Sequence, residues 1–257
     1  MIELRNVTKK FNVGTPDETT LFDNFQLHVS KGEFVSIVGS NGSGKTTLLN
    51  ILCGTLPVDG GSVLLNGKDI TKLSEHHRAR YIGRVFQDPQ KGSAATLTIL
   101  ENMALSDNKN HRYSLMPAIS KKRVDYYRSL LEVCNMGLEN RLDAKVGLLS
   151  GGQRQALALV MANMAPIDIL ILDEHTAALD PKSSERIMEL TDEFVTQHQV
   201  TALMVTHNLR YAVEYGTRLL MMDKGQIIID KSGEEKQSTT IDDVLHTFNE
   251  ISIECGN

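Results

Sequence analysis

The chain has 257 residues, of which 41% are hydrophobic and 23% charged, a composition that excludes a disordered protein and allows a sizeable buried core. Its formal net charge of -5 argues against a broad basic surface for phosphate backbones, so we expect no nucleic-acid partner. The N-terminus has no charged-then-apolar leader pattern, and the most apolar stretch, 157–172, is interrupted by polar residues. We therefore expect neither secretion by a leader nor a membrane-spanning segment.

The N-terminal region is predicted to form an antiparallel sheet. Strand-like stretches rich in apolar and β-branched residues occur at 2–7, 27–30 and 63–66. Sequences typical of turns lie among them, at Asp59-Gly60-Gly61 and Asn66-Gly67. We expect these strands to pair with one another and to pack beside a second, largely parallel sheet.

A glycine-rich loop follows the apolar strand predicted at 33–38 and precedes a helix predicted at 48–52. Its spacing, Gly39-x-x-x-x-Gly44-Lys45-Thr46, is that of a phosphate-binding loop in the required strand-loop-helix context. Glycines let backbone N–H groups curl around phosphate oxygens, and the helix N-terminus adds a favourable dipole. A simple Gly-Ser turn is the competing interpretation. We expect an ATP site, with Lys45 on the β and γ phosphates and Thr46 on Mg²⁺, formed by Ser40, Asn41, Gly42, Ser43, Gly44, Lys45, Thr46 and Thr47.

Between residues 97 and 146 the apolar pattern becomes helical. Val124, Leu130, Leu131 and Val133 are spaced along a segment that is otherwise rich in Lys, Arg, Asp and Tyr. The segment interrupts the succession of predicted strands. It is therefore our candidate for an inserted helical subdomain.

A short polar motif, Leu149-Ser150-Gly151-Gly152-Gln153, precedes a helix-like run at 154–164. The Ser150 hydroxyl and the N–H groups of Gly151 and Gly152, at a helix start, can form a second anion site. A helix N-cap followed by a glycine-rich turn explains the same residues. The phosphate loop upstream already supplies one phosphate site.

Two adjacent carboxylates end the buried strand predicted at 169–173. We expect Asp173 to hold Mg²⁺ through water and Glu174, one residue farther out, to polarise the attacking water as general base. Apolar strands that end in acidic residues are common. This interpretation therefore depends on the phosphate loop upstream.

The C-terminal part continues the alternation of strands and helices. Apolar runs at 201–205 and 219–223, together with those at 33–38 and 169–173, predict an α/β fold with a largely parallel sheet. The stretch 226–230 is expected to pair with 219–223 across a hairpin turn at Lys224-Gly225. Residues 241–251 are expected to form a last amphipathic helix.

In this order, the motifs resemble those of the ABC ATPases over residues 11–207, and the motif at 149–153 resembles the signature that other phosphate-loop enzymes lack. The resemblance implies the ABC ATPase fold: a phosphate-loop NTPase core with a largely parallel sheet, an N-terminal antiparallel β subdomain and an inserted helical subdomain. The resemblance also predicts that residues 1–257 form a single ABC ATPase domain. Within it, 1–96 and 147–235 form the ATP-binding core, 97–146 the helical insert and 236–257 a C-terminal helical tail.

The resemblance also implies roles for residues that are ordinary when taken alone. Phe11 matches the aromatic that stacks on adenine, often Tyr in the family, and a core phenylalanine is the competing interpretation. Gln87, otherwise a loop residue, matches the glutamine that reaches Mg²⁺ and the attacking water. Asp180, otherwise part of a turn, matches a loop that crosses the dimer interface. His207 matches the histidine that contacts the γ-phosphate and steadies the general base. The signature is expected to close over the ATP of the opposite subunit through Ser150, Gly151, Gly152 and Gln153.

Two departures from the family's usual pattern indicate a less common branch. His175 directly follows Glu174, where many family members carry proline, and we assign it no catalytic role. Residues 155–158, after the signature, read Gln-Ala-Leu-Ala where arginines are frequent. Neither departure touches the residues expected to bind or hydrolyse ATP.

The implied function is the ATP-hydrolysing subunit of an ABC transporter, bound peripherally on the cytoplasmic side of the cell membrane. Its expected partners are a second copy or a homologous ATPase subunit in an ATP-sandwich dimer, membrane permease subunits and, for an importer, an extracytoplasmic solute-binding protein. A single cassette resembles the subunits of bacterial importers, which favours uptake of a small solute such as an amino acid. Export and lipoprotein-extracting systems use similar subunits and remain alternatives.

Two other function classes are weighed against transport. A soluble ABC ATPase acting on nucleic acid or ribosomes is disfavoured by the single cassette and by the lack of sustained heptads. A small-molecule or nucleotide kinase explains Lys45 and Asp173 but leaves the signature and His207 without a role.

Overall fold

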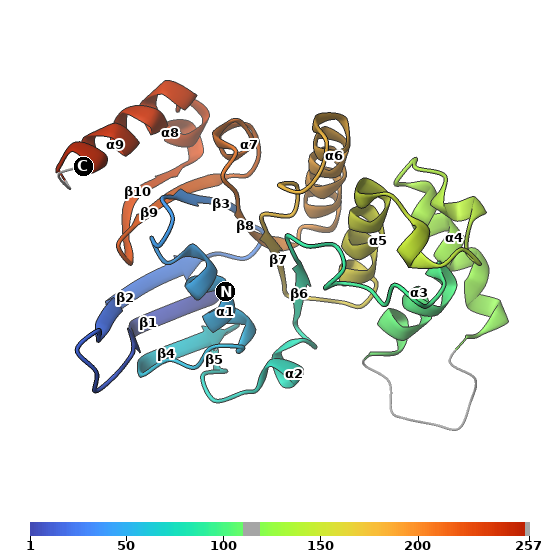
Figure 1. The fold of residues 1–257 in the computed structure, drawn as a ribbon, viewed down its shortest axis with the longest axis horizontal. Coiled ribbons are helices and arrows are strands. Elements are labelled where there is room, and N and C mark those ends of the chain that lie inside the picture. Colours follow the sequence, from blue (N-terminus) through green and yellow to red (C-terminus); the bar gives the residue numbers. More distant parts are fainter. Residues whose placement is uncertain (110–118, 255–257) are drawn as a thin grey trace. The chain divides into compact units, whose positions relative to one another are not determined.

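The computed structural model of the chain describes residues 1–109 and 119–254. The chain divides into two compact units, one built from Met1–Ala79 and Gln199–Asn257 and the other from Arg80–His198 (Figure 1). Within the described residues, no helix combines the length and the apolar character needed to cross a bilayer.

The first unit contains a four-stranded antiparallel sheet, as predicted. Its order is β2-β1-β4-β5, from β1 (Ile2–Phe11), β2 (Thr19–Val29), β4 (Gly60–Leu65) and β5 (Lys68–Asp69). β1 and β2 are longer than predicted because register shifts interrupt their alternation, with Asn6 and Asn24 at φ 48° and 53°. The turn predicted at Asp59-Gly60-Gly61 is wrong in part. Both glycines belong to β4. Gly61, at φ 81°, lies where the register of the pairing between β4 and β1 shifts.

The same unit contains a second, mostly parallel sheet. β3 (Phe34–Gly39) lies between β8 (Thr201–Val205) and β9 (Arg218–Asp223) and is parallel to both. β10 (Gln226–Ser232) pairs antiparallel with β9 across Lys224 and Gly225, which have φ values of 43° and 78°. Two consecutive positive φ angles suit the twist of a tight hairpin, so the predicted turn is confirmed.

Five helices accompany these sheets in the described part of the first unit: α1 (Lys45–Cys53), α2 (Glu75–Arg78), α7 (Leu209–Glu214), α8 (Gly233–Gln237) and α9 (Ile241–Glu254) (Figure 1). α7 and α9 pack on the mostly parallel sheet through a buried cluster of Val38, Ala212, Leu219, Met221 and Val244. The helix predicted at 241–251 is thereby confirmed. The last part of the predicted tail, 255–257, lies outside the described residues.

The second unit combines two parallel strands with helices. β6 (Ile82–Val85) pairs with β7 (Ile169–Asp173), and α5 (Gly151–Asn163) packs on β6 and on α6 (Pro181–His198). In its described residues, the region of the predicted insert contains α3 (Ile99–Asn108), α4 (Val124–Glu132) and the short 3-10 helices η1 (Lys121–Arg123) and η2 (Leu138–Asn140). A further 3-10 helix, η3 (Val146–Leu148), begins at the last residue of this region. The helical character of the region is confirmed, although its residues 110–118 lie outside the described chain. Its boundaries as a subdomain stay a prediction.

Candidate functional site

The loop between β3 and α1 has the backbone conformation that a phosphate cradle requires. Gly39, Gly42 and Gly44 have φ values of 153°, 82° and 106°, which residues with a Cβ rarely adopt. A Cβ added to Gly39 would lie 2.2 Å from the Met222 carbonyl oxygen of the neighbouring strand β9. Gly44 is in turn covered by the Phe22 ring, 2.9 Å from such a Cβ. The loop therefore tolerates no side chain at either end.

Lys45, the first residue of α1, is held inside this loop. It is only 5% exposed, and its Nζ donates to the carbonyl oxygens of Gly39 at 2.8 Å and Ser40 at 2.9 Å. The hydroxyl of Ser40 in turn donates to Asp223 Oδ1, at the end of β9, at 3.1 Å. The positive charge is thus fixed at the helix N-terminus, where backbone N–H groups also attract anions.

The outer surface of the loop is polar and accessible. Ser40, Asn41, Gly42 and Thr46 are exposed, Thr47 is half-buried and Ser43 is buried. An exposed hydroxyl at Thr46, one residue after the buried lysine, suits a ligand to a magnesium ion that accompanies phosphate.

Two more predicted residues belong to the same unit. Phe11 is the last residue of β1, is 36% exposed and has Lys9 Nζ 5.6 Å from its ring centre. It is therefore a surface aromatic and not the core phenylalanine of the competing interpretation. His207 is exposed and lies between β8 and α7, whose first turn is capped by the Asn208 side chain.

In the second unit, Asp173 is the last residue of β7 and forms an ion pair with Arg84, a partner that the sequence did not predict. Arg84, on the paired strand β6, donates to Asp173 Oδ2 at 2.7 Å, and both side chains are 14% exposed. The Arg84 guanidinium lies 4.7 Å from the Phe86 ring centre, and its Nε is buried without a hydrogen-bond partner. A charged residue inside an otherwise apolar strand was the signal available in the sequence.

Glu174 follows in a left-handed conformation, with φ 48°. Its neighbour His175 is buried, and this burial lowers the pKa of the imidazole to about 4. The ring is therefore neutral at physiological pH and packs inside the second unit.

The signature residues form the start of α5. Ser150 is the N-cap: its Oγ accepts from the Gln153 N–H at 3.3 Å, and its own N–H donates to Gln153 Oε1 at 3.2 Å. Gly152 faces Ser183 of α6 so closely that an added Cβ would lie 2.8 Å from the serine hydroxyl. The structure therefore shows the N-cap of the competing interpretation, while Ser150 and Gly151 are exposed, so that the start of the helix stays accessible.

Gln87 and Asp180 occupy exposed positions in the second unit. The carbonyl of Phe86, just before Gln87, accepts from the buried Gln155 Nε2 at 3.0 Å, which ties the loop to α5. Asp180 precedes α6, and its Oδ1 accepts from the Ser183 N–H at 3.1 Å. Hydrogen bonds from Ser183 lower the pKa of Asp180, so this carboxylate is charged and caps the helix.

The predicted site residues therefore divide between the two units. The phosphate loop, Phe11 and His207 belong to the first, whereas Gln87, the signature, Asp173, Glu174 and Asp180 belong to the second. Each of the residues expected to hold Mg²⁺, Thr46, Gln87 and Asp173, carries an oxygen group of the hard type that this ion prefers.

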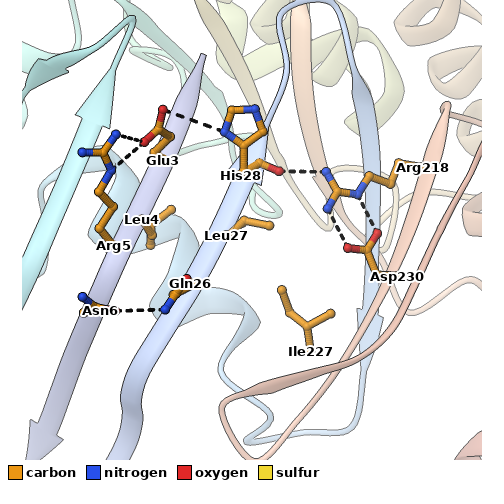
Figure 2. A pocket seen from close by; sticks show the side chains of 10 residues that line it. All are labelled: Glu3, Leu4, Arg5, Asn6, Gln26, Leu27, His28, Arg218, Ile227 and Asp230. Carbon is orange, nitrogen blue, oxygen red and sulfur yellow. Dashed lines mark hydrogen bonds and ion pairs between the residues drawn. The ribbon is translucent and has the colours of Figure 1, made fainter.

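A polar cavity of about 480 Å³ in the first unit is a separate feature (Figure 2). Its charged groups pair with one another. Arg218 donates to both carboxylate oxygens of Asp230 and to the His28 carbonyl, each at 2.7 Å. Glu3 likewise lies beside Arg5. The Arg218 bonds join β2, at the edge of the antiparallel sheet, to β9 and β10, whereas Glu3 and Arg5 both belong to β1. These interactions give the cavity a structural explanation.

Comparison with known proteins identifies the family. The protein-family model for "ABC transporter" matches residues 22–177 of this chain. A tyrosine transport ATP-binding protein of Clostridioides difficile (strain R20291) is 43% identical over 96% of this chain and 98% of its own length. The macrolide export ATP-binding/permease protein MacB of Pasteurella multocida (strain Pm70) is 35% identical over 90% of this chain but over 34% of its own length.

Among solved structures, a dimeric ATP-binding cassette in a post-hydrolysis state with ADP and Pi has a TM-score of 0.77 at 30% identity. The alignment covers 90% of this chain and 98% of that one. This chain belongs to the ABC transporter family, as an ATP-binding and ATP-hydrolysing subunit. The predicted fold class, enzyme class and family are thereby confirmed.

Proposed function

We propose that this subunit drives the uptake of tyrosine, or a closely similar amino acid, through separate membrane subunits. The similarity to the tyrosine transport ATP-binding protein, which extends over almost the whole of both chains, carries this proposal. The subunit works on the cytoplasmic side of the membrane, held there by its permease partners. An extracytoplasmic solute-binding protein would deliver the amino acid.

ATP binds at the phosphate loop, where the buried charge of Lys45 and the N-terminus of α1 stabilise the β and γ phosphates. Phe11 stacks on adenine with its exposed ring. Thr46, Gln87 and Asp173 would hold Mg²⁺, which would supply positive charge to neutralise the phosphates. The exposed N-terminus of α5, with Ser150, presents N–H groups that suit the γ-phosphate of a nucleotide on a second copy.

Hydrolysis uses Glu174 as general base, with His207 steadying it and Asp180 at the interface between copies. The dimeric relative with ADP and Pi supports a site shared between two chains. Closure of two copies around ATP, followed by their separation after hydrolysis, would move the permease subunits. A subunit that remains monomeric should therefore hydrolyse ATP poorly.

The catalytic assignment is tested with Glu174→Gln, which keeps the size of the side chain and removes the base. We expect ATP binding to persist, an ATP-dependent dimer to accumulate in size-exclusion chromatography, and turnover to fall by roughly a hundred- to ten-thousandfold. Near-normal hydrolysis in this variant would remove Glu174 from its role. Specific activity that does not depend on protein concentration, with no dimer in the variant, would contradict the shared site.

The transport assignment is tested by reconstituting the subunit in proteoliposomes with the permease encoded beside its gene. ATP-driven accumulation of labelled tyrosine, abolished by Glu174→Gln and reduced by excess unlabelled tyrosine but not by arginine, is the expected result. ATP-driven movement of tyrosine only away from the side that holds ATP and the subunit, or no movement of any amino acid, would contradict it.

Export is the second candidate function, favoured by the 35% identity to the ATP-binding part of MacB. MacB extends well beyond the part that this chain matches, whereas the tyrosine transport relative matches almost end to end. The same proteoliposomes, assayed for ATP-driven movement of a macrolide, separate the two candidates.

A further inference from the structure

The residue after the proposed general base is anchored to a helix. β7 ends at Asp173, Glu174 takes φ 48°, and the chain then turns towards α6, with Ala177 N–H donating to the Glu174 carbonyl at 2.9 Å (Figure 1). A left-handed conformation is unfavourable for a residue with a Cβ and persists only where neighbouring contacts fix it. The direction of the Glu174 carboxylate therefore depends on what holds the residues that follow.

His175 supplies such a contact from inside the second unit. Its side chain is 2% exposed, and Nε2 lies 3.1 Å from the hydroxyl of Thr191, a residue of α6 that is 0% exposed. The Thr191 hydroxyl donates its own proton to the Ile187 carbonyl at 2.7 Å. Because a hydroxyl has only one proton, Thr191 accepts from His175, and the proton of the imidazole is placed on Nε2.

A second contact holds the next residue on the same side of the helix. Ser184 Oγ donates to the Thr176 carbonyl at 3.1 Å. Ser184 and Thr191 are seven positions apart, a spacing that puts both on one face of α6. The segment after Glu174 is thus hydrogen-bonded to that face of α6 at two positions, Ser184 and Thr191.

We infer that His175 is a positioning residue, which sets the direction of the Glu174 carboxylate by anchoring the backbone to α6 through Thr191. The inference rests on the proposed role of Glu174. A proline at this place would fix its own φ through its ring but would have no side-chain donor. In this chain a buried hydrogen bond performs the anchoring, so the general base depends on a residue seventeen positions away in the sequence.

The test uses variants at both ends of the hydrogen bond. His175→Phe keeps a buried ring without a donor, and Thr191→Val keeps the shape of the side chain without an acceptor. Each is expected to lower kcat of the assembled transporter by roughly ten- to hundredfold, since small displacements of a catalytic group have effects of that size. The affinity for a fluorescent ATP analogue should stay within about twofold, because the phosphate loop is unchanged.

Two further variants provide rescue and coupling. Thr191→Ser retains the hydroxyl and should retain kcat within about twofold. The double variant His175→Phe/Thr191→Val leaves neither polar group unpaired, so its kcat should be no lower than that of the worse single variant. The matched control is Val195→Ala, which removes buried volume from the same helix one turn later and should leave kcat unchanged.

The possible outcomes separate this inference from the proposed function. Normal kcat in both single variants, or equal losses in Val195→Ala, overturns the positioning role. So does a loss of ATP affinity that matches the loss of kcat. If Glu174→Gln retains turnover, the proposed general base itself fails. If that variant is inactive while His175→Phe and Thr191→Val are normal, only the positioning inference fails.

Discussion

Two glycines of the phosphate loop allow a sharp test of what the loop's geometry requires. Gly39 and Gly42 both have positive φ, at 153° and 82°, yet their surroundings differ. A Cβ on Gly39 would lie 2.2 Å from the Met222 carbonyl oxygen, whereas a Cβ on Gly42 would have no heavy atom within 4 Å. Alanine therefore combines backbone strain with a steric clash at one position and gives strain alone at the other.

The two costs can be estimated separately. A carbon and a carbonyl oxygen normally approach to about 3.3 Å, so Gly39→Ala requires β3 or β9 to move by roughly 1 Å. Overpacking of this kind destabilises by about 1–3 kcal/mol, and an unfavourable φ adds about 1–2 kcal/mol. We therefore expect a loss of about 2–5 kcal/mol in the free energy of unfolding for Gly39→Ala. For Gly42→Ala, only the backbone contribution of about 1–2 kcal/mol is expected.

Urea denaturation of the two variants, with the slope of each transition compared with that of the parent, measures these losses. ADP affinity by isothermal titration gives an independent measure. It should fall by at least about tenfold for Gly39→Ala, because the clash displaces the loop at its first residue. Equal shifts of the denaturation midpoint in both variants would refute the argument from close approach.

Three other predictions address single groups. Arg84→Met removes the positive charge beside Asp173, so Mn²⁺ binding in the presence of a non-hydrolysable ATP analogue, followed by EPR, should become roughly three- to tenfold tighter; weaker binding would contradict this. Phe11→Ala should lower ATP affinity by about tenfold and Phe11→Tyr should preserve it, as measured by titration, whereas equal affinities would exclude stacking. The folded pKa of His175, about 4, lies below the ordinary 6.5, so the unfolded state binds more protons between these values and stability is lost as the pH falls through that window. Urea denaturation at pH 7 and 4.5 should show that His175→Phe removes a pH-dependent loss of about 2 kcal/mol, and an unchanged pH dependence would show that this imidazole is not responsible.

The sequence was sufficient to predict the features that depend on neighbouring residues. The phosphate loop, the carboxylates after β7 and the Lys224-Gly225 hairpin each follow from residues adjacent in the chain, and the described structure contains all three. The lengths of β1 and β2 were underestimated because their bulges reverse the side-chain alternation on which the prediction rested.

Contacts between distant residues could not be predicted in the same way. The Arg84–Asp173 pair joins residues 89 positions apart and depends on the register between β6 and β7. The Ser40–Asp223 bond similarly requires knowing that β3 and β9 are neighbours. Hydrophobic periodicity indicates which face of a helix or strand is buried, but not which other element lies beside it. These partners can therefore be identified only from the fold.

The arrangement of β3 also has a consequence for how the protein is made. All six residues of β3 are buried, and its partners β8 and β9 begin at Thr201 and Arg218. At a ribosomal rate of roughly 5–20 residues per second, the strand and the phosphate loop wait on the order of ten to forty seconds before their neighbours are synthesised. During that interval this strand, which is buried along its whole length in the folded protein, has no sheet to join, and nucleotide cannot stabilise it. We therefore expect the nascent chain to bind chaperones, and truncated chains that end before β8 to aggregate.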